Sequence, residues 1–278
     1  MFRCELRRTS LTLVVLTIIA FSGFLQSTEA QDQPAGLATK MLRSIGSKKG
    51  LCVVLGSEDG RLAVELSRDG QYLVHGLCTS REAVARARQV IDKAELRGVV
   101  SAETGSVRRL PYSDNIVNLV VVENTGPALE NGLQLKEVQR VLRPGGVVWL
   151  GNWNTDGRKI SEEQLQEFFE GPGAVALEED GDWVRLRKSR PKSMDEWTHP
   201  RGDANGNPVS SDRQIGVPTG VRWVAGPNWP TGDRKASTPS AVASDRHLAV
   251  VFQDEIKTAK GMSKENSLIV RDVYNGLR

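Results

Sequence analysis

The chain has 278 residues, enough for one or two domains, and its 39% hydrophobic and 26% charged content is ordinary for a globular protein. Its formal net charge of +3 is too small to indicate a nucleic-acid-binding protein. The basic residues between Arg185 and Lys192 are typical of a solvated strand end and linker. We therefore expect no nucleic-acid partner.

The first thirty residues have the layout of an export signal. Arg3, Arg7 and Arg8 precede an apolar run from Leu11 to Leu25, and small or polar residues follow as far as Ala30. We expect cleavage after Ala30, which makes residues 1–30 a signal peptide and the mature protein periplasmic or secreted. The alternative is an uncleaved membrane anchor, although the apolar run is shorter than the roughly 20 residues of a spanning helix.

Two cysteines, Cys52 and Cys78, lie beyond the expected signal, which itself contains Cys4. An exported protein allows a disulfide between them. However, they fall at opposite ends of neighbouring predicted strands, farther apart than the roughly 7 Å that a disulfide spans. We expect both thiols to be buried and free. No cysteine or histidine spacing indicates a metal site.

Strands and helices are predicted to alternate after a helix that ends at Ile45, so residues 31–50 form an N-terminal helix and linker. A capping box of Thr79 and Glu82 marks the start of a longer helix that Gly98 ends. The other predicted helices cover Arg61–Ser67, Leu133–Leu142 and Ser161–Glu170. The predicted strands cover Leu51–Leu55, Gln71–Leu77, Val99–Ala102, Ile116–Val122, Val147–Leu150, Ala174–Glu178 and Trp183–Arg187.

This alternation predicts a doubly wound α/β domain with a mostly parallel, Rossmann-like sheet. The last two strands flank the turn at Asp180 and Gly181, so they are predicted to close the sheet as an antiparallel hairpin. The domain is expected to cover residues 51–190.

Four segments of this domain resemble class I S-adenosylmethionine (SAM) dependent methyltransferases of the type 11 kind. Val53–Ala63 looks like the donor-binding loop, Ser80–Arg88 the second helix, and Leu110–Asn115 the L-P-F-x-D-N segment. Leu135–Gly146, with the letters LKEVQRVLRPGG, is very close to the family's L-x-E-x-x-R-V-L-x-P-G-G run. The order and spacing of all four agree over about 140 residues.

The resemblance implies that SAM is the cofactor and that it lies over the carboxyl ends of the strands. It carries the donor-binding role over to a short set of positions after the first three strands. These candidate cofactor-binding residues are Gly56, Ser57, Glu58, Gly60, Cys78 and Ser106.

Several of these positions depart from the family pattern. Glu58 stands where the loop usually has glycine, and Cys78 and Ser106 stand where acids would bind the ribose and the adenine. Val54 and Asn118 also replace acids. Each lost charge-assisted hydrogen bond costs about 1.5–3 kcal/mol, so two or three losses predict binding weaker by about a hundredfold or more. Glu58, Asp59 and Glu103 are the acids that could compensate.

Other polar and aromatic residues allow two interpretations each. His75 is either a base near the pocket or a packed histidine, and Glu123 either orients a substrate amine or is solvated. Trp149 and Trp153 either stack on an acceptor or pack in the core. The catalytic residues stay unassigned.

Residues 191–278 resemble the opening blade of a quinoprotein-like (PQQ-like) β-propeller, on the segments Trp197–Asp203, Val221–Trp223 and Arg271–Gly276. Short strands are predicted at Val221–Val224, Ser240–Ala243, Leu248–Phe252 and Ser267–Val270. A propeller needs about four to eight blades, so this all-β segment is expected to be incomplete and the chain cut short. No PQQ-binding residue can be assigned from one blade.

Two functions remain open. The first is a SAM-dependent methyltransferase with a degenerate donor site and an unknown acceptor. The second is a non-catalytic, exported, methyltransferase-like module fused to a propeller that binds an extracytoplasmic ligand. A nicotinamide-binding Rossmann domain is a weaker third alternative, because the loop is not G-x-G-x-x-G.

Overall fold

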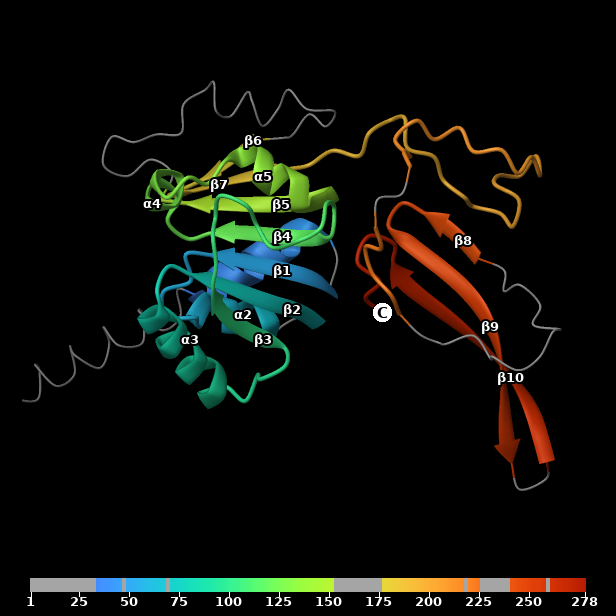
Figure 1. Ribbon diagram of the computed structural model, residues 1–278, viewed down its shortest axis with the longest axis horizontal. Helices are drawn as coiled ribbons and strands as arrows, with labels where there is room; N and C mark the ends of the chain where they lie inside the picture. The colour runs from blue at the N-terminus through green and yellow to red at the C-terminus, as the bar shows by residue number, and fades with distance from the viewer. Residues whose placement is uncertain are drawn as a thin grey trace, which may run out of the picture.

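The computed structural model describes residues 34–46, 49–68, 71–152, 177–217, 220–225, 241–258 and 261–278. The described residues form an α/β unit and a smaller, all-β C-terminal unit (Figure 1). The expected signal, Trp153 and the predicted Ser161–Glu170 helix lie outside the described residues. Within the described part of the chain, no helix combines the length and the apolar character needed to cross a bilayer.

A seven-stranded sheet forms the centre of the α/β unit, in the order β3-β2-β1-β4-β5-β7-β6. The first five strands are parallel, and β7 and β6 close the sheet antiparallel, as predicted. β4 is central because all its side chains are buried and apolar except one asparagine. The strands are β1 (Lys49–Leu55), β2 (Gln71–Cys78), β3 (Val100–Thr104), β4 (Val117–Val122), β5 (Leu142–Gly151), β6 (Leu177–Asp180) and β7 (Trp183–Arg187).

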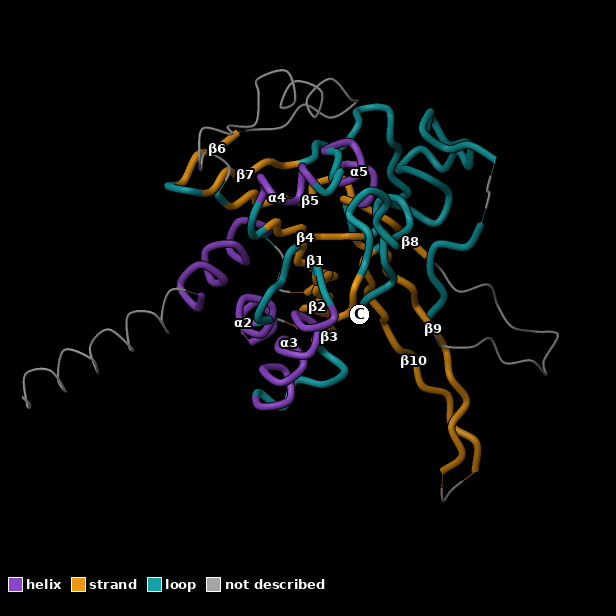
Figure 2. Tube along the Cα trace, turned by 60° about the vertical axis from the view of Figure 1, so that its left-hand side comes forward, coloured by secondary structure: helices purple, strands orange, loops and turns teal. Residues whose placement is uncertain are grey.

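Alternate side chains of the central strands face two separate hydrophobic cores, which makes the unit three-layered. On one face, Val54 and Val121 pack with a helix over residues 34–45 and with α2 (Arg61–Arg68) and α3 (Arg81–Lys93). On the other face, Val53 and Val120 pack with α4 (Thr125–Glu130) and α5 (Leu135–Val141). Helices therefore lie on both faces of the sheet (Figure 2). This is the doubly wound fold that the sequence predicted.

The local starts and ends differ from the predictions at two helices. The cap of α3 is Ser80 and not Thr79. The Ser80 hydroxyl accepts from Ala83 N at 3.1 Å, while the Thr79 hydroxyl donates to Glu58. The predicted helix over Leu133–Leu142 shortens to α5, because Leu142 is already extended and begins β5.

β5 is longer than the predicted strand Val147–Leu150, since the Pro-Gly-Gly segment at residues 144–146 also lies within the strand. A register shift against β4 accommodates it between Val117 and Leu119. The short helix α4 was not predicted, because its six residues carry too little periodicity to be recognised.

The C-terminal unit is a three-stranded antiparallel sheet in the order β10-β9-β8. Its strands are β8 (Ala241–Ser244), β9 (His247–Thr258) and β10 (Gly261–Asp272). The last two strands extend well beyond the predicted segments, into polar sequence where alternation gave no signal. The predicted strand at Val221–Val224 is wrong: these residues have no strand pairing and their side chains are largely exposed or half-buried.

The end of the C-terminal unit docks on the amino-terminal edge of the large sheet, at Asn118 of β4. The fully buried Asn118 amide accepts from Leu51 N at 2.8 Å and from Asn275 Nδ2 at 2.7 Å, and it donates to Asp272 Oδ2 at 3.1 Å. A Cβ at Gly50 would lie 2.4 Å from Asn118 Cγ, so only glycine fits at this position of β1 beside the amide. Asn118 is thus a docking residue at the edge opposite the carboxyl ends of the strands.

Candidate functional site

A cleft of about 620 Å³ opens at the carboxyl ends of the parallel strands. It lies where the strand order reverses between β1 and β4, which is where doubly wound sheets bind ligands. Residues after β1, β2, β3 and β4 line it together. They are Gly56, Glu58, Leu77, Cys78, Thr79, Gly105, Ser106, Val107, Asn124, Pro127, Ala128 and Asn131.

The first turn of the cleft requires glycine at Gly56. Its φ of +76° lies in the left-handed region, and its N–H donates to Leu77 O at 2.9 Å. A Cβ at this position would meet no atom within 4 Å, so the backbone faces open space on the cleft side. The structure therefore places Gly56 where a ligand can approach the main chain.

Two other predicted loop residues do not line the cleft. Gly60 has φ +74°, and a Cβ there would lie 2.9 Å from Ala87 Cα, so this glycine lets α2 and α3 pack closely. Ser57 is only 1% exposed, and its Oγ has no hydrogen-bond partner among the described residues. Their roles in this structure are packing beneath the loop.

Glu58 reaches from the first loop to the end of β2. Its Oε1 accepts from Thr79 Oγ1 at 2.5 Å, and its Oε2 lies 3.3 Å from Arg86 Nη2. The carboxylate is about half exposed and lines the same cleft as Cys78. A negative charge is thus present beside the position where the family resemblance expects a ribose-binding acid.

Cys78 and Ser106 line the cleft as neutral groups. Burial, followed by the nearby Glu58 and Glu123 carboxylates, raises the pKa of the Cys78 thiol to about 11, so it is uncharged at neutral pH. Ser106 Oγ accepts from Arg108 N at 3.2 Å, which holds the turn after β3. Neither residue replaces the hydrogen bonds of an acid. Cys52 and Cys78 are both buried and unpaired with each other, as predicted.

The other two acids that could compensate lie elsewhere. Asp59 caps α2 by accepting from Arg61 N at 2.9 Å. Glu103 lies 3.1 Å from His75 Nε2, while His75 Nδ1 is 2.6 Å from the Tyr112 hydroxyl. His75 is therefore a packed residue on a different groove, and its pKa is lowered by burial and raised in part by Glu103.

Glu123 follows β4 directly and is not a solvated loop carboxylate. One of its oxygens is buried with no hydrogen-bond partner among the described residues. Burial, with the charges of Asp59 and Glu58, raises its pKa from 4.5 to about 8. At neutral pH this carboxyl is largely protonated. Glu123 is not itself among the residues that line the cleft, although the next residue, Asn124, is. The sequence pointed to this position, but its protonation depends on the converging loops.

Trp149 packs in the core and does not stack on a ligand. It is 2% exposed, its indole N–H donates to Ser44 Oγ at 3.1 Å, and its ring meets Trp183 edge-on at 6.4 Å. The hydrogen bond ties β5 to the helix over residues 34–45.

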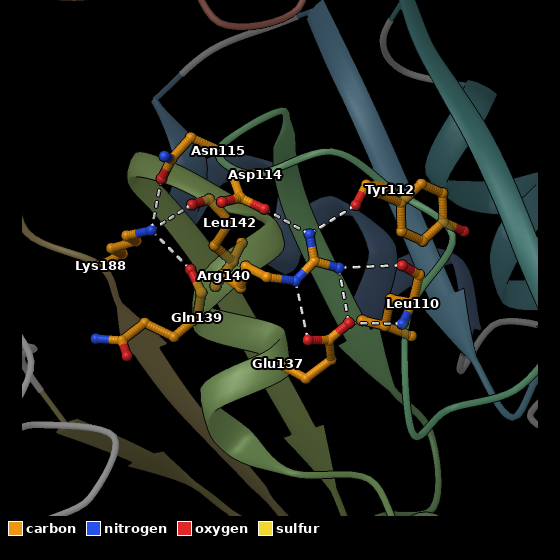
Figure 3. A network of polar contacts seen from close by, with 9 residues as sticks. All are labelled: Leu110, Tyr112, Asp114, Asn115, Glu137, Gln139, Arg140, Leu142 and Lys188. Atoms are coloured by element: carbon orange, nitrogen blue, oxygen red, sulfur yellow. Dashed lines mark hydrogen bonds and ion pairs between the residues drawn. The ribbon is translucent and has the colours of Figure 1, made fainter. Parts of the chain in front are cut away.

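The LKEVQRVLRPGG segment lies away from the cleft, in a polar network at the opposite edge of the sheet (Figure 3). Arg140 donates to Leu110 O at 3.0 Å, Tyr112 O at 2.8 Å and Asp114 Oδ1 at 2.6 Å. Glu137 pairs with Arg140 at 2.7 Å and accepts from Leu110 N, also at 2.7 Å. The Leu110–Asn115 and Leu135–Gly146 segments, which resemble family motifs, are therefore held together by one hydrogen-bond network.

Lys188 completes this edge (Figure 3). Its ammonium group donates to Asn115 Oδ1 at 2.7 Å, Gln139 O at 2.6 Å and Leu142 O at 2.8 Å. Burial lowers its pKa to about 8 despite the nearby Asp114 carboxylate. These bonds join the residue after β7 to the loop before β4, to α5 and to the start of β5.

Residues 53–150 match the family model described as a methyltransferase domain. The α/β unit is methyltransferase-like. The match covers the strands and loops that form the cleft, and the mostly parallel sheet agrees with it. No curated protein matched the chain.

Solved structures similar to the chain include several described as methyltransferases. A putative SAM-dependent methyltransferase from Methanococcus maripaludis is 20% identical, with a TM-score of 0.47, over 58% of this chain and 87% of that one. A SAM-dependent methyltransferase from Aquifex aeolicus is 19% identical, with a TM-score of 0.43, over 59% and 96%. A TehB-like SAM-dependent methyltransferase from Corynebacterium glutamicum is 17% identical, with a TM-score of 0.42, over 62% and 99%.

Proposed function

We propose that the cleft binds SAM and that the methyltransferase-like unit transfers a methyl group to an acceptor. The observation that carries this proposal is the meeting of Gly56, Glu58 and Ser106 at one cleft on the carboxyl edge of the sheet. When bound, SAM supplies an electrophilic methyl group on a sulfonium centre. The protein's share of such a reaction is mainly to position donor and acceptor.

The cleft residues fit this ligand in part. The open backbone at Gly56 suits the amino-acid end, and Glu58 supplies a carboxylate. Ser106, Asn124 and Asn131 offer neutral hydroxyl and amide groups to the base. The thiol of Cys78 adds only a weak partner. Binding weaker than that of a full set of acids is therefore expected.

Glu123, the neighbour of the lining residue Asn124, is the acid that we expect an acceptor to meet. Because its carboxyl holds a proton at neutral pH, it would donate a hydrogen bond to an acceptor oxygen or nitrogen.

Calorimetric titration of the full chain with SAM and with S-adenosylhomocysteine tests the proposal. We expect dissociation constants in the micromolar range. No detectable heat at millimolar ligand would contradict SAM binding and leave the non-catalytic module as the better function.

Two glycine variants make this titration specific. Gly56→Ala places a methyl group on the cleft side of a positive-φ turn, so it should weaken binding. Gly98→Ala is the matched control, because Gly98 has φ +86°, equal open space and a position outside the cleft. Equal weakening by both variants would mean that backbone strain, and not the cleft, is responsible.

The alternative function is a methyltransferase-like module that binds without transferring a methyl group. The neutral Cys78 and Ser106 favour it, since both stand where acids are expected. We also propose that the protein is exported, on the layout of residues 1–30. N-terminal sequencing of the secreted or periplasmic protein should begin at Gln31, and retention in the cytoplasm would contradict export.

We propose that the C-terminal unit is part of a propeller blade. Its antiparallel order and its final turn support this, in which Asp272 Oδ1 accepts from Tyr274 N at 2.9 Å and Asp272 O from Gly276 N at 2.8 Å. Reading the coding sequence beyond the Arg278 codon tests it. Further repeats of this pattern are expected, and an immediate stop codon would contradict it.

A further inference from the structure

We propose that Glu58 recognises two neighbouring hydroxyl groups of the ligand, so that the cleft holds a ribose from its first loop instead of from the end of β2. This inference rests on the proposed function and names the group that selects the ligand. It also gives a role to the glutamate that makes the loop differ from the family pattern.

Glu58 is the one carboxylate among the described residues that line the cleft. Three other acids lie in the neighbouring loops but outside the lining: Asp59 accepts from Arg61 N, Glu103 contacts His75, and Glu123 has one oxygen buried. Any charge-assisted hydrogen bond from a ligand hydroxyl to a described lining side chain must therefore end on Glu58.

The carboxylate of Glu58 is held in place from two sides. Thr79 donates to Oε1 at 2.5 Å, and Arg86 lies 3.3 Å from Oε2. Thr79 is itself a lining residue, so this pair closes the distance between the ends of β1 and β2. Thr79 and Arg86 are positioning residues for the carboxylate.

Glu58 has unused hydrogen-bond acceptor sites that suit a diol. A carboxylate has about four lone-pair sites, and the contacts above use two of them. Adjacent hydroxyl groups donate to the two oxygens of one carboxylate as a pair, whereas a thiol such as that of Cys78 accepts weakly.

The test is a double-mutant cycle between protein and ligand. The binding of S-adenosylhomocysteine and of its 2′-deoxy counterpart is measured by calorimetry on the full chain and on Glu58→Gln. We expect Glu58→Gln to weaken S-adenosylhomocysteine by about 10-fold or more, and the wild type to lose a similar factor with the deoxy ligand. Glu58→Gln should bind both ligands alike, because the shared hydrogen bond is already gone.

Two further variants keep the result interpretable. Glu103→Gln is the matched control, since it removes a carboxylate outside the cleft and should leave both affinities within about twofold. Thr79→Val keeps Glu58 but removes its donor, so it should weaken S-adenosylhomocysteine by a smaller factor and reduce the penalty of the deoxy ligand.

The outcomes separate the two proposals. If the wild type binds S-adenosylhomocysteine and Glu58→Gln still distinguishes the deoxy ligand as strongly as the wild type does, the diol role of Glu58 is wrong and SAM binding stands. If the wild type binds neither ligand, both proposals fail together. Equal losses in Glu58→Gln and Glu103→Gln would also overturn the inference, because they would report charge and not contact.

Discussion

The two edges of the large sheet carry opposite kinds of structure. At the carboxyl edge, an open cleft is lined by backbone, hydroxyl groups and one carboxylate. At the amino edge, Arg140, Lys188 and Asn118 form closed networks that bind loops and the end of the C-terminal unit. The residues that resemble the methyltransferase family most closely belong to the second edge. The family-like residues of this chain therefore serve mainly to hold the sheet together and not to line the cleft.

The difference between the two edges is tested most directly by substituting Arg140. Arg140→Met would leave the half-buried Glu137 carboxylate and two backbone carbonyls without their donor. We expect a loss of about 3 kcal/mol in the free energy of unfolding, measured by denaturant titration. Arg97→Met, which removes an exposed pair with Asp92, should leave the free energy of unfolding almost unchanged. Equal losses would contradict a stabilising network at this edge.

Asn118→Asp tests the docking of the C-terminal unit. The substitution removes the amide N–H that donates to Asp272 and places a second negative charge beside that residue in a buried position. We expect a loss of about 2 kcal/mol in stability and faster proteolysis of residues 241–278. Adding Asp272→Asn restores a donor opposite the acid and should recover much of the loss. A double variant as unstable as the sum of its parts would contradict the contact.

The smallest expected effect concerns Glu123 at the carboxyl edge. Its folded pKa of about 8 lies above its ordinary 4.5, so the native state binds more protons and the free energy of unfolding falls as pH rises from 4.5 to 8. Glu123→Gln removes this titration. We expect the variant to match the wild type near pH 4.5 and to exceed it by about 1–2 kcal/mol at pH 5.5–6, since each unit of pH above 4.5 adds about 1.4 kcal/mol. A stability difference that is the same at both pH values would contradict the raised pKa.

Much of the α/β unit could be predicted, because its strands are short apolar runs bounded by turns. Leu51–Leu55 and Ile116–Val122 were expected to be parallel neighbours, and β1 and β4 pair in this way. The boundaries that failed depend on tertiary contacts. Thr79 donates to Glu58 and Ser80 caps α3. The Pro-Gly-Gly segment lies within β5, where the register against β4 shifts.

The site was predicted less completely than the fold. Gly56, Glu58, Cys78 and Ser106 do line one cleft, because parallel strands bring their carboxyl ends together. Gly60 does not, since its lack of a side chain serves the contact with α3. Which acid faces the cleft depends on how the loops converge, and periodicity and spacing carry no information on that. The role of Asn118 needed a partner 154 residues away in the chain.

The docking at Asn118 has a consequence for how the protein can be elaborated. Its C-terminal β unit is joined on the far side from the ligand entrance, beneath the starts of β1 and β4. Further residues added to the C-terminal unit at this end would not cover the cleft. The α/β unit thus keeps its cleft and its contact with the C-terminal unit at opposite ends of the same parallel strands.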